Sequence, residues 1–228
     1  MKSYTYGDLK KQVEAELDLA GENFVTADEL LQYCNDAISE AEAEIHRLQI
    51  EDQYFLTKTS VALTPGQTMI DFPEDIYANK IVSIIAFENN YTYKVKLYRH
   101  THRMDRFERI ANAFENDDYQ FLVLNQTSPK IMLAPAARNN GGRLEIWYIR
   151  SVSRVVDESS EIEIPEFDNF IVSLMKAKCR AKENLGVIPQ DAMAEVQANR
   201  RLMLDTLSNR VEEEPDYQSE FDYYVTHN

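Results

Sequence analysis

The fold is decided by residues 54–72, YFLTKTSVALTPGQTMIDF, where the hydrophobic pattern changes from the period of a helix to that of a strand. β-Branched and aromatic residues fill both halves of this stretch, and a Thr-Pro-Gly-Gln turn at 64–67 separates them. We therefore predict two strands, at 54–63 and 68–72, that pair as a β-hairpin.

Further strands are predicted downstream, at 79–87, 91–98, 119–124, 130–133 and 143–150. A short polar turn at 88–90 joins the first two as a second hairpin. Short connections fit antiparallel pairing, because neighbouring parallel strands need a longer crossover. A short helix at 101–111 interrupts the series. The middle of the chain is thus expected to form an antiparallel β-sandwich or small barrel.

Two helices are predicted before this β-rich middle, over about 5–20 and 26–51. Each begins with a capping box, formed by Thr5 with Asp8 and by Thr26 with Glu29. The second helix carries an apolar stripe, whose members are Leu30, Leu31, Cys34, Ile38, Ala41, Ile45 and Leu48. Its other face is acidic and consists of Glu29, Asp36, Glu40 and Glu44.

Two more helices are predicted after the β-rich middle. Pro165 opens one at about 166–185, which Gly186 ends, and another follows at 190–209. Lys178 and Lys182 border the apolar face of the first. The second offers it a partner face made of Ala192, Val196, Leu202, Met203 and Leu207.

These elements predict an α+β fold, in which helices from both ends of the chain form a bundle and the β-rich part is an insertion. The expected boundaries are 1–53 with 160–210 for the bundle and 54–159 for the β-rich domain. Residues 211–228 are expected to be an extended tail.

The charge is distributed unevenly. The net charge is −15, which argues against a protein that wraps nucleic acid by neutralising its phosphates. Residues 1–56 hold 4 Lys or Arg against 13 Asp or Glu, and residues 211–228 hold 6 acids and no Lys or Arg. The two ends therefore carry the whole net charge, which suggests either a shared surface or partner, or acidic helix faces that aid solubility.

Cys34 and Cys179 both fall within apolar helical patterns, where buried reduced thiols are expected and a disulfide is not. This usage favours a reducing compartment. The start of the chain lacks the pattern of a secretion signal, and no stretch has the roughly 20 apolar residues of a membrane span. Neither secretion nor membrane insertion is expected.

The search for catalytic motifs finds none of the usual ones: no GxGxxG, GxxxxGK[ST], GxSxG, HExxH or CxxC occurs. His100, His102 and Asp105 are conceivable metal ligands, but the arginines around them would repel a cation. We name no catalytic, cofactor-binding or metal residue and expect no cofactor.

Those arginines form a basic strip, whose members are Arg99, Arg103, Arg106 and Arg109. The strip is compatible with a solvated helix face, with pairing to an acidic part of a neighbouring subunit, or with phosphate contact.

The tail combines acids with aromatic residues. After three consecutive Glu, the apolar positions are Tyr217, Phe221, Tyr223, Tyr224 and Val225. Aromatic side chains are costly to expose and common as anchors at interfaces. We expect the tail to dock on another chain, by strand addition or in a groove.

Two stretches carry a resemblance to a known family: LTPGQTMIDFPEDI at 63–76 and IPEFDNFIV at 164–172. The first is similar to the strand, turn and strand that enter the β domain of tailed-phage adaptor proteins, and the second resembles the start of their late helix. With the N-terminal helical pair, the order of elements resembles the head-to-tail connector, or tail tubular, family over most of the chain.

The resemblance implies a structural subunit without catalysis, made in the host cytoplasm and placed in the virion at the head-to-tail junction. Its homo-oligomer would be a ring, often of twelve subunits, beneath the portal protein, leaving a channel for double-stranded DNA during genome ejection. The tail would reach the portal, and the β domain would face the next tail component, a nozzle or second ring. Glu29, Asp36, Glu40 and Glu44 would then face the channel, where like charge lets DNA slide.

Two other function classes stay open from the sequence. One is a β-domain binding or regulatory module that oligomerises through its helices. The other is a hydrolase whose catalytic residues match no familiar motif.

Overall fold

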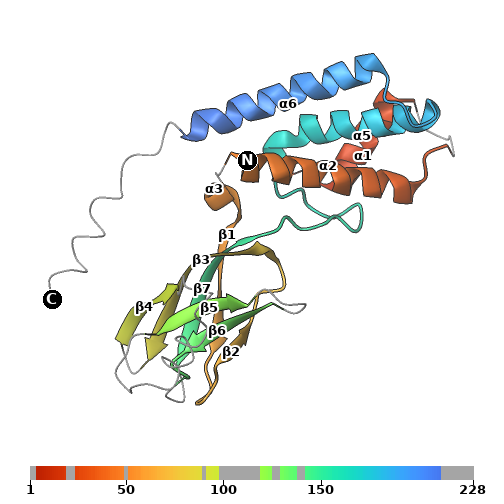
Figure 1. The fold of residues 1–228 in the computed structure, drawn as a ribbon. Coiled ribbons are helices and arrows are strands. Elements are labelled where there is room, and N and C mark those ends of the chain that lie inside the picture. The colour runs from red at the N-terminus through yellow and green to blue at the C-terminus, as the bar shows by residue number, and fades with distance from the viewer. Residues whose placement is uncertain are drawn as a thin grey trace. The chain divides into compact units, whose positions relative to one another are not determined.

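Figure 1 shows the computed structural model, which describes residues 4–18, 24–48, 51–88, 91–97, 119–124, 129–137 and 142–211. The chain divides into two compact units. The described parts of Met1–Glu51 and Val152–Asn228 form a helical unit, and those of Asp52–Ser151 form a β unit. The predicted α+β class is confirmed.

Both capping boxes are present. Helix α1 (Tyr6–Glu16) begins where the Asp8 amide donates to Thr5 Oγ1, and α2 (Ala27–Arg47) where the Glu29 amide donates to Thr26 Oγ1, each over 3.3 Å. The apolar stripe of α2 is buried at Leu30, among other positions. Both helices end about four residues before the predicted limits, at Glu16 and Arg47.

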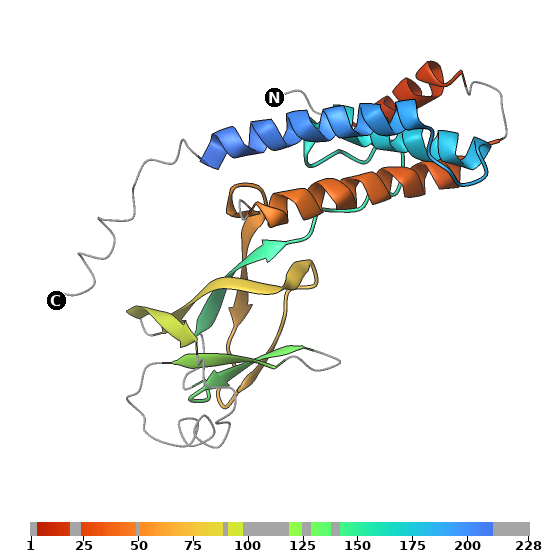
Figure 2. The same cartoon turned by 45° about the horizontal axis from the view of Figure 1, so that its top comes forward.

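Helix α5 (Asp168–Glu183) is the centre of the helical unit, as Figures 1 and 2 show. It follows a 3₁₀ turn at Pro165–Phe167, and α1, α2 and α6 (Gln190–Val211) all pack on it. Every residue from 170 to 177 is consequently buried. A helix surrounded by partners needs an apolar surface all round, whereas the sequence predicted one apolar face for this helix.

Helix α6 contributes most of its predicted packing face. Ala192, Val196, Met203 and Leu207 are buried, whereas Leu202 is 64% exposed. Including Leu202 in that face was wrong, because the adjacent Met203 occupies the inward direction of this helical turn.

Residues 152–164 run along the helical unit. The Val152 amide donates to Glu42 Oε1 over 2.9 Å, and Asn35 exchanges two hydrogen bonds with the backbone of Val155. These contacts group the segment from Val152 onward with the helices, whereas the sequence-based boundary lay at residue 159.

The β unit follows α3 (Glu51–Phe55) and contains one curled seven-stranded sheet. The strands are β1 (Leu56–Ala62), β2 (Met69–Asp71), β3 (Ile76–Glu88), β4 (Tyr91–Leu97), β5 (Gln120–Leu124), β6 (Lys130–Ala134) and β7 (Arg143–Arg150). Their order across the sheet is β1-β7-β3-β4-β5-β6-β2. Its core includes Ile84, Tyr119, Ile131 and Ile146.

The sheet is mixed, whereas the sequence predicted an antiparallel one. β4 and β5 are parallel, and the other neighbours are antiparallel. The connection from 98 to 119 is long enough for a crossover, which a parallel pair requires. The hairpin of β3 and β4 is confirmed.

The predicted hairpin of the first two strands is wrong, although its turn forms. The Gln67 amide donates to Thr64 O over 3.0 Å, and Gly66 has a φ of +82°. However, β1 pairs with β7 and β2 with β6, at opposite edges of the sheet. Residues 63–68 span at most roughly 20 Å. The sheet must therefore curl to bring its edges within reach of this connection.

Candidate functional site

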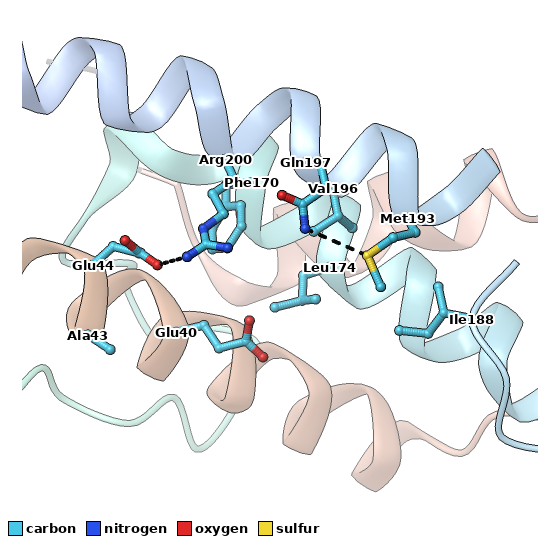
Figure 3. Close-up of a pocket in the computed structure, with 10 residues that line it drawn as sticks. All are labelled: Glu40, Ala43, Glu44, Phe170, Leu174, Ile188, Met193, Val196, Gln197 and Arg200. Carbon is cyan, nitrogen blue, oxygen red and sulfur yellow. Dashed lines mark hydrogen bonds and ion pairs between the residues drawn. The ribbon is translucent and has the colours of Figure 1, made fainter. Parts of the chain in front are cut away.

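The helical unit holds a groove of about 340 Å³ between α2, α5 and α6, shown in Figure 3. It exists because α2 and α6 both pack on α5, which forms the floor between them. The lining residues are Glu40, Ala43 and Glu44 from α2, Phe170 and Leu174 from α5, Ile188, and Met193, Val196, Gln197 and Arg200 from α6.

The groove is apolar along its floor, carries the Glu40 carboxylate on its α2 side, and has an ion pair at one end. There Arg200 Nη2 pairs with Glu44 Oε1, and this ion pair joins α6 to α2. Glu44 is 9% exposed and also pairs with Arg47 over 2.7 Å. The lining carries two carboxylates, Glu40 and Glu44, and contains no Ser, Thr, Cys, His or Lys. An apolar floor of this kind can receive an apolar segment of another chain.

The acids predicted to face a channel lie along α2, and most of them pair with cations of the same unit. Glu29 binds Lys182 Nζ over 2.7 Å, Asp36 binds Lys178 Nζ over 2.7 Å, and Glu44 binds Arg200. Glu40 is exposed at the rim of the groove. The hydrogen bonds from Lys182 and from the Thr26 amide hold the pKa of Glu29 at about 2. A channel-facing role stays a prediction.

Lys176 is a structural residue that the sequence analysis missed. Its side chain is 11% exposed, and Nζ lies 2.6 Å from Glu16 of α1 and 2.5 Å from Glu195 of α6. Burial opposes the charge, but the hydrogen bonds to the two carboxylates outweigh it and raise the pKa of Lys176. The available signal was a single cation inside the apolar run at 170–177.

The turn between α5 and α6 exposes apolar side chains. We call residues 184–189 the α5–α6 corner. Leu185 is 97% exposed and Val187 is 62% exposed. The corner is held by hydrogen bonds from the Gly186 amide to Ala181 O, over 2.7 Å, and from the Val187 amide to Asn184 O, over 3.0 Å. These exposed side chains are candidates for contact with another chain.

Both cysteines are free thiols, as predicted, and both are buried. Burial raises the pKa of Cys34 to about 12 and that of Cys179 to about 11, so neither carries an appreciable fraction of thiolate near neutral pH. Within the described ranges, no group of three or more His, Cys, Asp or Glu is arranged to hold a metal ion.

Comparison with known families gives a match over most of the chain. A family model described as SU10 adaptor protein matches residues 4–220. The chain belongs to the SU10 adaptor protein family. This is a phage head-to-tail adaptor family, so the resemblance drawn from the sequence is confirmed. None of the curated proteins matches the chain.

An SU10 adaptor has a structural role in the phage particle and interacts with other head or tail components. Membership therefore makes this chain a virion component. Every helix in the described part of the chain is too short or too polar to cross a membrane.

Several predicted elements of this SU10 adaptor lie outside the described residues. They are the short helix at 101–111, the candidate ligands His100, His102 and Asp105, the basic strip, and the anchors of the tail. The strip consists of Arg99, Arg103, Arg106 and Arg109, and the anchors are Tyr217, Phe221, Tyr223, Tyr224 and Val225. Their roles stay predictions.

Proposed function

We propose that this adaptor is a subunit of a homo-oligomeric ring, of about twelve copies, that joins the portal protein to the tail and leaves a channel for DNA. The observation that carries the proposal is the family match over residues 4–220, which includes both units of the chain. The proposed role is mechanical, and no catalytic step is part of it.

The two units would make different contacts in the ring. The helical unit would make the contacts between subunits. Contacts between two different surfaces of identical subunits form a closed ring when the rotation from one subunit to the next divides a full turn evenly. The β unit, whose core is separate from that of the helices, would face the next tail component. The tail at 211–228 would bind the portal through its aromatic residues.

The channel proposal rests on charge. Duplex DNA is repelled by an acidic wall and slides along it without adhering. The residues before 57 carry an excess of nine acids over Lys and Arg. On α2 the ion pairs of Glu29, Asp36 and Glu44 reduce the repulsion, so Glu40 is the predicted channel residue whose charge is most available to solvent.

The portal contact is tested with the purified chain and the portal protein of the same phage. In one variant, Tyr217, Phe221, Tyr223 and Tyr224 are each replaced by Ser, and in a matched control the six acids of 211–228 are replaced by Asn or Gln. We expect the aromatic variant to lose portal binding and the control to retain it. Binding that survives deletion of 211–228 would refute the docking role of the tail.

A further inference from the structure

We propose that the α5–α6 corner of one copy inserts into the groove between α2, α5 and α6 of the neighbouring copy, and that this contact joins subunits around the ring. The inference deepens the proposed ring and rests on it. It assigns the contact to two surfaces that both lie in the helical unit.

The corner is shaped to protrude. Leu185 has a φ of +52° and Gly186 a φ of +89°, so the chain reverses sharply and directs the Leu185 side chain into solvent. The hydrogen bonds of Gly186 and Val187 fix this conformation before any contact is made. A pre-formed apolar projection loses little conformational freedom when it is buried.

The groove is shaped to receive an apolar projection. Phe170 and Leu174 form its floor, and Met193 and Val196 line the α6 side (Figure 3). The corner of the same chain does not fill it: Ile188 lines one end of the groove, while Leu185 is 97% exposed. A corner in the groove must therefore come from a second copy.

Charge favours the corner over the aromatic tail as the occupant of the groove. Glu40 and Glu44 stand on the α2 side of the groove, and Arg200 is already bound to Glu44. The tail at 212–228 would bring six more acids against these carboxylates. Residues 184–189, Asn-Leu-Gly-Val-Ile-Pro, carry no charge and meet no such repulsion.

The contact repeats from copy to copy. Corner and groove adjoin at Ile188, but Leu185 does not line the groove, so a copy that receives a neighbour's corner still has its own Leu185 free to enter the next groove. A contact between two different surfaces forms a closed ring when the rotation that relates neighbouring subunits divides a full turn evenly.

Cysteine cross-linking tests the contact directly. Chains carrying Leu185→Cys are mixed with chains carrying Ala43→Cys and oxidised under ring-forming conditions with the portal present. Ala43 lines the groove, and the native Cys34 and Cys179 are fully buried. The matched control replaces Leu185→Cys by Val156→Cys, because Val156 is also apolar, is 73% exposed and belongs to the same unit.

We expect a disulfide-linked dimer from the Leu185→Cys and Ala43→Cys mixture at least several-fold more abundant than from the control. Equal yields would overturn the proposal. Cross-linking of the Ala43→Cys chain to the portal instead would assign the groove to another occupant and also overturn it.

A second measurement separates this inference from the ring itself. Leu185→Glu should prevent ring formation on the portal, as measured by particle mass, whereas Val156→Glu should not. Both positions are exposed, and circular dichroism verifies that the variants fold. Rings that form normally with Leu185→Glu would overturn the corner contact and leave the ring intact. If the wild-type chain forms no ring, the proposed function fails, and the corner contact fails with it.

Discussion

The triad of Lys176, Glu16 and Glu195 gives the sharpest prediction about stability. Lys176 ties α5 to α1 and α6 through contacts of 2.6 Å and 2.5 Å, and 11% of its side chain is exposed. Replacing Lys176 by Met keeps most of the buried stem and removes the charge. The two carboxylates then lose their common partner.

The size of the expected loss in stability depends on how far water can solvate the two carboxylates once Lys176 is replaced. Removing one partner of a fully buried ion pair costs about 3–5 kcal/mol, and exposed pairs contribute about 0–1 kcal/mol. Glu16 and Glu195 are each 41% exposed and therefore rehydrate in part. We expect Lys176→Met to reduce the free energy of unfolding of the helical unit by about 2 kcal/mol, between these limits.

The assay is urea unfolding with two probes. Far-UV circular dichroism reports mainly on the helices, and the fluorescence of Trp147, the only tryptophan, reports on the β unit. The matched control is Lys178→Met, because Lys178 is 25% exposed and pairs with Asp36. It should lose less than about 1 kcal/mol. A Lys176→Met chain as stable as the wild type, or less affected than the control, would refute the reasoning.

Three further predictions concern pH and packing. The folded pKa of Glu29 is about 2, below its ordinary 4.5, so the unfolded chain binds more protons between these values. The contribution of Glu29 to stability is therefore present above pH 4.5 and is lost as the pH falls towards 2. A Glu29→Gln chain should lose less stability than the wild type over this pH range, as measured by acid unfolding followed by circular dichroism. Gly7→Ala should destabilise α1, because the added Cβ would lie 2.9 Å from Glu158 O, although Ala favours helices elsewhere; a raised midpoint of thermal unfolding would contradict this. Ile131→Ala should cost about 2–5 kcal/mol, since Ile131 is fully buried in the β unit, and an unchanged Trp147 fluorescence transition would count against that packing.

Local signals in the sequence predicted the elements well. A capping box is a hydrogen-bond pattern within four residues, so Thr5 and Thr26 mark helix starts whatever surrounds them. The strand positions were similarly evident, because β-branched and apolar residues reflect a half-buried extended chain.

Long-range pairing could not be predicted in the same way. The turn at 64–67 indicates that the chain bends there, but the partners of β1 and β2 are strands some 60 to 90 positions further along the chain. The acidic face of α2 likewise looked solvated, because the cations that neutralise it, Lys178, Lys182 and Arg200, belong to helices far away in the sequence.

The groove and the α5–α6 corner were also beyond sequence reasoning. A groove depends on the spacing of three packed helices, and the exposure of Leu185 depends on which way a tight turn points. Gly186 was identified as a helix stop, but a stop signal says nothing about the side chains beside it.

The most direct test of the central claim is electron cryomicroscopy of the chain assembled on the portal protein of the same phage. We predict a closed ring of about twelve copies beneath the portal, with an open axial channel and the helical units in contact. A chain that stays monomeric beside the portal, or that binds it as single copies without a ring, would contradict the account.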